Sequence, residues 1–360
     1  MARVCVTGGN GFLGSRIVRA LQEHGYEVVA LVGADLDSGN LEGVDVERRD
    51  LDLLDPGSVH KALDGGELLV HNAACYSFWE PDAQYIYRVN VRGTRHVLDA
   101  ARDHGYRRIV YTSSTATLTP SLDRELESEE GLLDLRRFHG HYKCSKMLAE
   151  IAVLREMARG LPGMIVHPTA VIGPGDRRPT PSGGIVLHFI NGRMKVYADT
   201  ALNLVDVDDV ARGHVLALER GELGERYILG GENSGLGEVA GLLSELTGIA
   251  APRVAIPAGL LGVAGRVGEW LADHVTHRTP LVDRESTLHA LRNRPVDSSK
   301  AVRELGYNWR PMRLTLARAV EWFVENGYCK PRFARRIREH GVLEGVASGS
   351  PAEAWGPGRV

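Results

Sequence analysis

Several features are scarce in this sequence of 360 residues, and each scarcity excludes a class of protein. No run reaches the roughly 18 apolar residues of a membrane-spanning helix, so we expect no membrane span. The four cysteines, Cys5, Cys75, Cys144 and Cys329, form no CxxC pair, which argues against a metal site and a disulfide framework. Neither charge sign dominates: 43 basic and 46 acidic residues give a net charge of −3, without the basic excess that indicates a nucleic-acid partner. The N-terminus has no signal-peptide pattern, so a cytoplasmic location is expected.

Glycine, by contrast, is abundant: 42 residues, or about 12% of the chain against about 7% in an average protein. Gly8, Gly11 and Gly14 form a GxxGxxG motif. The motif follows the apolar run Val4–Thr7 and opens a helical pattern over Ser15–Gln22. This context predicts a dinucleotide site, because the glycines let the backbone approach a pyrophosphate that the helix N–H groups face.

Short β-rich runs alternate with longer helical patterns through the first 170 residues. This order builds a parallel sheet with helices on both faces. We predict strands at Val4–Thr7, Glu27–Val32, Leu68–His71, Arg108–Thr112 and Gly163–His167, and helices at Phe12–His24, Pro56–Leu63, Ala83–Gly105 and Tyr142–Arg159.

The pattern changes after residue 170. Gly/Pro-rich loops cover 173–175 and 179–184, and a further strand–helix unit follows at 203–219. We predict an α/β protein with a doubly wound parallel sheet (a Rossmann fold) over residues 1–170, joined by the unit at 203–219, and a smaller C-terminal substrate-binding lobe over 171–330. Residues 331–360 read as a flexible tail. In the second half we further predict a strand at Arg226–Leu229 and helices at Gly237–Thr247, Ser298–Leu305 and Leu314–Asn326.

The end of the second strand normally reads the adenosine ribose, and there an acid favours NAD whereas an arginine suits the 2′-phosphate of NADP. The strand ends in Gly33-Ala34-Asp35, so Asp35 is the candidate acid, unless it is only solvated. Arg16, in the first turn after the glycines, could reach a 2′-phosphate. The sequence therefore leaves NAD against NADP open.

Tyr142 and Lys146 stand four residues apart, on one face of a predicted helix. A free phenol has a pKa of about 10, and an ammonium held close favours the phenolate, which makes a proton donor or acceptor useful at neutral pH. Ser114 ends the strand at Arg108–Thr112, where hydroxyls enter the ligand crevice and can hydrogen-bond a reacting oxygen. We predict Ser114, Tyr142 and Lys146 as catalytic residues, with Ser113 as the alternative serine.

This ordered set resembles the extended short-chain dehydrogenase/reductase family, also called the NAD-dependent epimerase/dehydratase family. The likeness runs from Thr7 to about Tyr328. Within the family it is similar to the dihydroflavonol-reductase-like branch, which includes the hopanoid-associated sugar epimerases. The stretches that carry the likeness are Tyr111–Ser114, Gly140–Lys146, Pro179–Gly183, Asn203–Ala211 and Tyr227–Asn233.

The resemblance implies roles for further residues around an NAD(P) cofactor. Asp50 and Leu51 would flank the adenine, Asn72-Ala73-Ala74 would line the cofactor, Asn90 would be the structural asparagine, and His167-Pro168-Thr169 would cover the nicotinamide. With these, the expected cofactor-binding residues are Gly8, Gly11, Phe12, Leu13, Gly14, Asp35, Asp50, Leu51, Asn72, Ala73, Ala74, Asn90, Tyr142, Lys146, His167, Pro168 and Thr169.

Four positions depart from the family pattern. Gly33 stands where the reductases of this branch carry an arginine, so their NADP preference does not transfer. His167 replaces an asparagine or arginine, and Asp206 stands where a histidine is usual. Thr115 stands where sugar dehydratases have an acid, which disfavours dehydration.

We expect a reductase that transfers hydride from NAD(P)H to a ketone or aldehyde, or the reverse. Tyr76, Phe78 and Trp79 would form an aromatic wall suited to a hydrophobic or ring-containing substrate. The alternatives are a nucleotide-sugar 4-epimerase with tightly bound NAD and a non-catalytic NAD(P)-binding sensor. An epimerase needs a cationic clamp for a diphosphate, for which Arg177, Arg178 and Arg193 are candidates. The family resemblance also implies a homodimer formed through the helices Ala83–Gly105 and Tyr142–Arg159.

Overall fold

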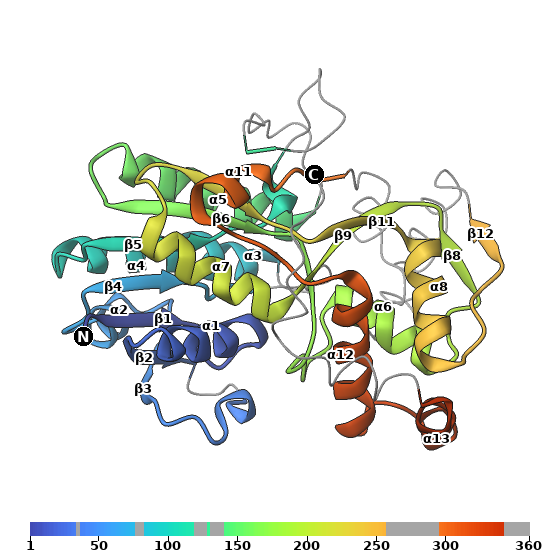
Figure 1. The fold of residues 1–360 in the computed structure, drawn as a ribbon. Coiled ribbons are helices and arrows are strands. Elements are labelled where there is room, and N and C mark those ends of the chain that lie inside the picture. The colour runs from blue at the N-terminus through green and yellow to red at the C-terminus, as the bar shows by residue number, and fades with distance from the viewer. Residues whose placement is uncertain (34–36, 76–82, 119–127, 130–139, 257–294, 342–360) are drawn as a thin grey trace.

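The computed structural model describes residues 1–33, 37–75, 83–118, 128–129, 140–256 and 295–341. Seven parallel strands form the main sheet in the order β10-β6-β5-β4-β1-β2-β3 (Figure 1). This arrangement confirms the predicted doubly wound α/β fold. The strands are β1 (Arg3–Thr7), β2 (Glu27–Val32), β3 (Glu47–Asp50), β4 (Leu68–His71), β5 (Arg108–Thr112), β6 (Gly163–Pro168) and β10 (Arg226–Leu229).

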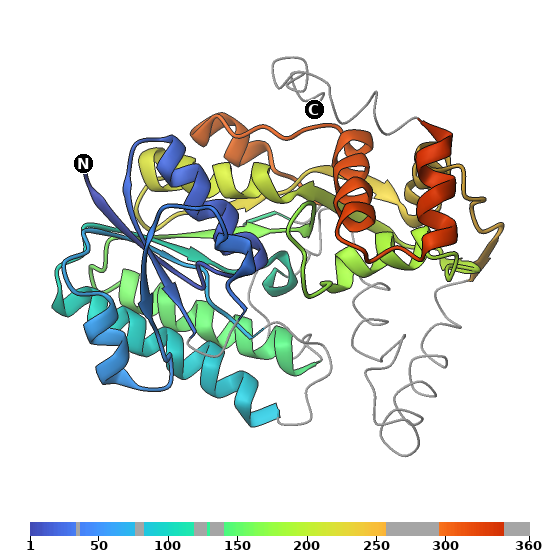
Figure 2. The same cartoon turned by 90° about the horizontal axis from the view of Figure 1, so that it is seen from below.

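Helices cover both faces of the main sheet (Figure 2). Alternate residues of each strand supply the two cores: Val4 and Val6 of β1 pack with α1 and α7, whereas Cys5 packs with α2, α4 and α5. One face carries α1 (Phe12–Glu23), α7 (Val207–Arg220) and α11 (Ser299–Leu305); the other carries α2 (Pro56–Ala62), α4 (Thr94–Asp103) and α5 (His141–Met157).

The predicted helix at Ala83–Gly105 is three segments. α3 (Ala83–Tyr87) passes through a π-helical stretch, Arg88–Gly93, into α4. Such π-helical stretches often occur at functional sites, and this one contains Asn90.

The smaller lobe is built on a three-stranded sheet of β11 (Glu232–Gly235), β9 (Ala201–Asp206) and β7 (Ala170–Ile172). Its core lies among α6 (Pro181–Ile190), α8 (Leu236–Thr247) and α12 (Met312–Glu325). A two-stranded ribbon of β8 (Val196–Ala198) and β12 (Val254–Ile256) lies at its edge.

The chain crosses between the two sheets at two neighbouring points. β6 becomes β7 at Thr169, and β10 becomes β11 at Gly230-Gly231. A Cβ at Gly231 would lie 2.1 Å from Leu204 O, so only glycine fits there. Asn203 exchanges hydrogen bonds with the Gly231 backbone at 2.8 and 3.0 Å, which fixes the second crossing against β9.

The structure corrects three expectations. The strand of the unit at 203–219 belongs to the small sheet, while Arg226–Leu229 supplies the seventh strand of the main sheet. The glycines at 183–184 lie in the first turn of α6, because Thr180 caps this helix by accepting from Gly183 N at 3.1 Å. Part of the predicted tail is a helix, α13 (Pro331–His340), which buries Ala334 and Ile337. The remainder, 342–360, lies outside the described residues.

Candidate active site

The order of the main sheet reverses between β1 and β4, and ligands bind at such a point in open α/β sheets. Gly8 follows β1, and Asn72 follows β4. Thr7 ties the two segments together: its Oγ1 accepts from Asn72 N at 3.1 Å and from Ala73 N at 3.0 Å. Ala74 is exposed next to them.

The glycine turn leaves room for backbone to approach a ligand. Gly8 has φ +67°, and a Cβ at Gly14 would lie 2.0 Å from Gly8 O. The N-cap of α1 is Gly11, with no side-chain cap and no acid in the first turn. The N–H groups of that turn are therefore open to an anionic ligand, which is what a pyrophosphate requires. Phe12 and Leu13 are half-buried in this turn.

A neutral histidine lies under this edge of the sheet. Burial, with a contribution from Lys146, lowers the pKa of His71 to about 3. Its Nδ1 lies 2.8 Å from Thr7 Oγ1 and its Nε2 lies 3.0 Å from Thr94 Oγ1. Because Thr7 Oγ1 already accepts two amide hydrogens, its own hydrogen is free for Nδ1, and Nε2 then donates to Thr94.

The side chain of Asn90 links two segments by hydrogen bonds. Its Nδ2 donates to Cys75 O at 3.0 Å and to Ser145 Oγ at 2.9 Å, and its Oδ1 accepts from Cys75 N at 2.7 Å. It therefore joins the segment after β4 to α5. At the other edge, Asp50 is exposed at the end of β3 and Leu51 is buried beside it. Asp35 lies outside the described residues.

Tyr142 and Lys146 both lie on the buried side of α5, with exposed fractions of 6% and 3%. Lys146 Nζ donates to Thr112 O at 2.7 Å and stands 4.7 Å from the centre of the Tyr111 ring. Burial lowers the pKa of this lysine to about 8, while the negative charge of Glu150 acts in the opposite direction. The ammonium is thus held at the end of β5, beside the predicted serines.

The two serines differ in what they contact. Ser113 Oγ donates to the carboxylate of Glu150, and Thr117 Oγ1 donates to the same oxygen at 2.7 Å. Ser114 is less buried, and its Oγ accepts from Ala116 N at 3.1 Å at the start of a short 3-10 turn, Thr115–Thr117. The Ser113 hydroxyl is therefore engaged with Glu150 in the interior, whereas Ser114 is partly exposed.

Glu150, which the sequence prediction did not include, contacts three residues beside the predicted site: Ser113, Thr117 and His167. It is fully buried on α5, and His167 Nε2 donates toward both carboxylate oxygens at 3.1 Å. Burial alone would raise the pKa of Glu150, but His167 and the hydroxyls of Ser113 and Thr117 outweigh it and hold this pKa at about 2. The available signal was spacing: Tyr142, Lys146 and Glu150 follow one another every four residues, along one helical face.

The predicted nicotinamide loop lies at the crossing between the two sheets. His167 is fully buried, so its ring faces Glu150 rather than solvent, and Pro168 is buried after it. Thr169 Oγ1 and His167 Nδ1 are buried without a hydrogen-bond partner in the described part of the chain. An unpaired buried hydroxyl is costly, so Thr169 fits a place where a bound cofactor would supply the partner.

Arg16 and Arg177 lie where the two lobes meet. Arg16 Nε is 3.3 Å from both Pro174 O and Asp208 Oδ1, so it is engaged with the loop after β7 and the start of α7 rather than with the ribose end. Arg177 crosses in the other direction: its Nε donates to Asp37 Oδ2 at 3.0 Å, just after β2. Its guanidinium lies 2.5 Å from where a Cβ on Gly39 would be, so a larger residue there would displace this exposed side chain.

The other residues singled out in the sequence are the aromatic residues, the possible clamp arginines and Asp206. Tyr76, Phe78 and Trp79 lie outside the described residues. Arg178 is exposed beside Arg177, while Arg193 follows α6 in the turn that contacts the start of α13. Arg177 and Arg193 are thus attached to different parts of the molecule. Asp206 caps α7 by accepting from Asp208 N at 2.8 Å and pairs with Arg318 of α12 at 3.2 Å.

None of the helices described is long and apolar enough to cross a membrane. No group of three or more metal-ligating side chains occurs in the described ranges.

Comparison with known proteins gives the chain a family. Residues 4–230 match the model of the NAD dependent epimerase/dehydratase family. A Synechocystis sp. protein named for dihydroflavonol 4-reductase is 40% identical over 90% of this chain and 95% of its own length. Sterol demethylase protein B of Methylococcus capsulatus is 37% identical over 89% and 98%. The crystal structure of gox2253 superposes with a TM-score of 0.82 at 39% identity, covering 92% of this chain and all of that one. With its seven-stranded sheet and glycine turn, the chain belongs to the NAD-dependent epimerase/dehydratase family, the extended short-chain dehydrogenases/reductases, which are oxidoreductases that use NAD(P) on CH–OH or C=O groups.

Proposed function

We propose that this protein reduces a ketone or aldehyde of a small hydrophobic or ring-containing metabolite, and oxidises the corresponding alcohol in reverse. The observation that carries the proposal is the hydrogen bond of 2.7 Å from Lys146 Nζ to Thr112 O. It places the ammonium on the same face of α5 as Tyr142, and next to the turn that carries Ser114. A bound nicotinamide cofactor would supply the hydride.

The protein residues then manage the proton and the carbonyl oxygen. Tyr142 donates its phenolic proton to the oxygen, and the Lys146 ammonium favours the phenolate that remains. Ser114 donates a hydrogen bond to the same oxygen and so stabilises the charge that develops there. Ser113 supports this turn through Glu150 instead of touching the substrate.

The cofactor would bind along the switch point. The N–H groups of α1 and the glycine turn would hold the pyrophosphate, Asn72 and Ala73 would line its path, and Thr169 would take the nicotinamide end. The unpaired Thr169 hydroxyl and the close approach of Gly14 to Gly8 support this assignment.

Two observations favour a hydrophobic substrate over a nucleotide sugar. Relatives with 40% and 37% identity carry names that refer to dihydroflavonol and sterol, both ring compounds. A diphosphate clamp would need arginines that converge, whereas Arg177 pairs with Asp37 and Arg193 is exposed in the turn that Asn191 joins to Lys330.

The test is a screen of the purified protein, with NADH and with NADPH, against flavanone-like, steroidal and aliphatic ketones. The absorbance of the reduced cofactor is the readout. We expect at least one ring ketone to cause oxidation of the cofactor. This activity should be lost in Tyr142→Phe. Val302→Ala, at a valine of α11 that is 39% exposed, is the control and should keep activity. Interconversion of a UDP-sugar without net change of cofactor would assign the epimerase alternative. Full biological activity of Tyr142→Phe would indicate a sensor.

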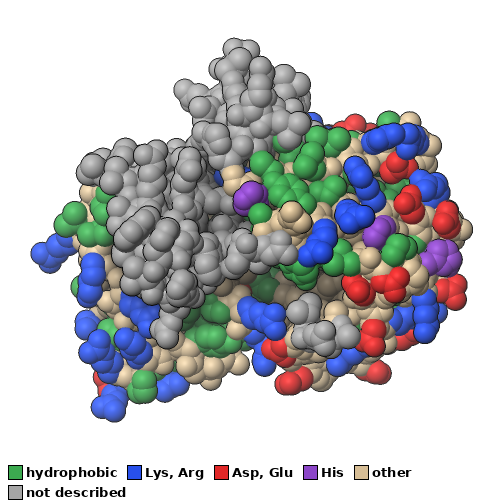
Figure 3. Space-filling view, turned by 180° about the vertical axis from the view of Figure 1, so that it is seen from behind, with side chains coloured by type: hydrophobic (Ala, Val, Ile, Leu, Met, Phe, Trp, Pro, Cys, Tyr) green, Lys and Arg blue, Asp and Glu red, His purple; other side chains and the backbone are tan. Residues whose placement is uncertain are grey.

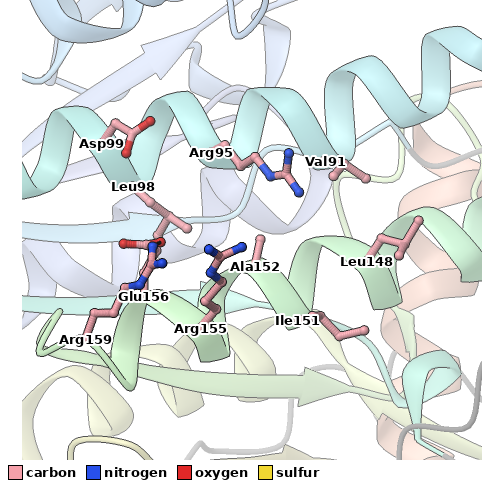
Figure 4. Close-up of a pocket in the computed structure, with 10 residues that line it drawn as sticks. All are labelled: Val91, Arg95, Leu98, Asp99, Leu148, Ile151, Ala152, Arg155, Glu156 and Arg159. Atoms are coloured by element: carbon pink, nitrogen blue, oxygen red, sulfur yellow. Dashed lines mark hydrogen bonds and ion pairs between the residues drawn. The ribbon is translucent and has the colours of Figure 1, made fainter.

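We also propose a homodimer through the outer faces of α4 and α5. These helices border a hollow of about 390 Å³ that is lined by Val91, Arg95, Leu148, Ile151 and Arg155, among others (Figure 4). Ile151 is 37% exposed at its rim. Two such helix pairs packed together would cover these apolar side chains as a four-helix bundle.

A further inference from the structure

The far end of the small lobe has an unusual concentration of cations. Helix α13 and the residue before it contribute five: Lys330, Arg332, Arg335, Arg336 and Arg338, all exposed. The apolar side of this helix, with Ala334 and Ile337, is buried on the lobe. All five charges are therefore left on the solvent side.

Two neighbouring segments extend this cluster. Lys330 N donates to Asn191 Oδ1 at 2.9 Å, which holds the turn after α6 against the start of α13. Arg193 and Lys195 are exposed in that turn. The turn leads into the ribbon of β8 and β12, so we call α13, residues 191–195 and this ribbon the distal surface. In Figure 3, Lys and Arg side chains gather at the lower left of the view, where α13 lies.

These cations differ in their partners from several arginines elsewhere in the protein. Arg3, Arg102 and Arg318 each pair with acidic side chains. In the described part of the chain, the five cations of α13 have no carboxylate within ion-pair distance: Arg336 donates to the Gly248 backbone, and Arg332 lies over the Phe333 ring at 4.6 Å. A protein of net charge −3 thus keeps a positive field at one end.

Exposed aliphatic side chains lie within the same surface. Val196 and Val254 are register partners on β8 and β12, and they are 41% and 57% exposed. Lys195 and Arg253 precede them along the two strands and are exposed as well. Cations beside aliphatic side chains match the interface of a bilayer, where phosphates lie next to acyl chains.

We propose that the distal surface binds the surface of an anionic lipid membrane. The arginines contact lipid phosphates, and Val196 and Val254 enter the interfacial region. A nucleic-acid backbone would satisfy the charges but would leave the exposed valines without a partner. Such binding is peripheral and needs no membrane-spanning helix. It also does not depend on the identity of the substrate.

The test is sedimentation of the whole protein with vesicles of phosphatidylcholine alone or with 30% phosphatidylglycerol, at low and high salt. We expect binding to the anionic vesicles only, weakened by salt, and at least tenfold weaker for the double variant Arg335→Glu/Arg338→Glu. The control is Lys61→Glu/Arg303→Glu, at exposed cations of α2 and α11 on the nucleotide-binding domain, which changes the net charge equally and should bind like the wild type. Circular dichroism melting and NADH binding confirm that both variants are folded.

Three outcomes would overturn the proposal: equal binding to neutral vesicles, equal loss in the two double variants, or no binding of the folded wild type. Tighter binding to duplex DNA than to vesicles, with DNA displacing the protein from lipid, would assign the surface to nucleic acid instead.

Discussion

His167 and Glu150 form a fully buried pair, with His167 Nε2 at 3.1 Å from each carboxylate oxygen of Glu150. The pair joins β6 to α5 directly behind Lys146. Because Glu150 also accepts from Ser113 and Thr117, one carboxylate holds the end of β5, the start of the crossing at β6 and α5 together.

Removal of this carboxylate should destabilise the fold. Glu150→Ala leaves His167, Ser113 and Thr117 without their acceptor, and breaking a buried pair costs about 3–5 kcal/mol. Glu150→Gln keeps an acceptor and should recover part of this loss. Urea unfolding measures both, with Glu23→Ala, an exposed glutamate at the end of α1, as a control expected to change little.

The same pair predicts a pH dependence of stability. The pKa of Glu150 is lowered from 4.5 to about 2, so its stabilising contribution is complete above pH 4.5 and disappears as the pH falls toward 2. The melting-temperature difference between wild type and Glu150→Gln should therefore narrow below pH 4.5. A gap that stays constant down to pH 3 would contradict the lowered pKa.

Lys146 should set an alkaline limit on activity. Burial lowers its pKa from 10.5 to about 8, so the ammonium is lost as the pH rises through 8. We expect kcat/KM for the ketone found in the screen to fall above this pH. In Glu150→Gln the fall should begin at lower pH, because Glu150 favours the ammonium. A profile that is flat to pH 10, in wild type, would exclude this role for the lysine.

Arg177 should influence the choice of cofactor. Its guanidinium lies at Asp37 after β2, where the adenosine ribose is read, and arginine is a strong phosphate partner. Arg177→Ala should weaken NADPH binding several-fold more than NADH binding in a fluorescence titration. The adjacent change Arg178→Ala serves as the control. If the variant weakens the binding of both cofactors equally, the role of Arg177 is to hold the two lobes together.

Ile151→Glu should dissociate the proposed dimer. A carboxylate on the outer face of α5 would be buried without a partner in a four-helix bundle. Light scattering coupled to size exclusion should give a monomer for this variant and a dimer for the wild type. Val302→Glu on α11 changes a valine of similar exposure, 39% against 37%, and should remain dimeric. A monomeric wild type would contradict the proposal.

The strands predicted from sequence show why patterning works in the interior. Val4–Thr7 and Arg108–Thr112 are apolar runs between turn residues, and both are buried strands of the main sheet. β3 was missed because Glu47-Arg48-Arg49-Asp50 is wholly charged. At the edge of the sheet, where one side has no neighbouring strand, such residues pair with β2 and stay solvated.

The sequence by itself determined the elements whose signal is local: the strand–glycine–helix unit, the four-residue spacing of Tyr142 and Lys146, and the alternation of strands and helices. Only the tertiary structure decided which strands belong to which sheet, because β7 and β9 look like any short apolar run until pairing places them together. It also decided that Glu150 meets His167, residues 17 apart on different elements. Burial, which gives that pair its strength and shifts the pKa of Lys146, is a property of the packed chain and has no local signature.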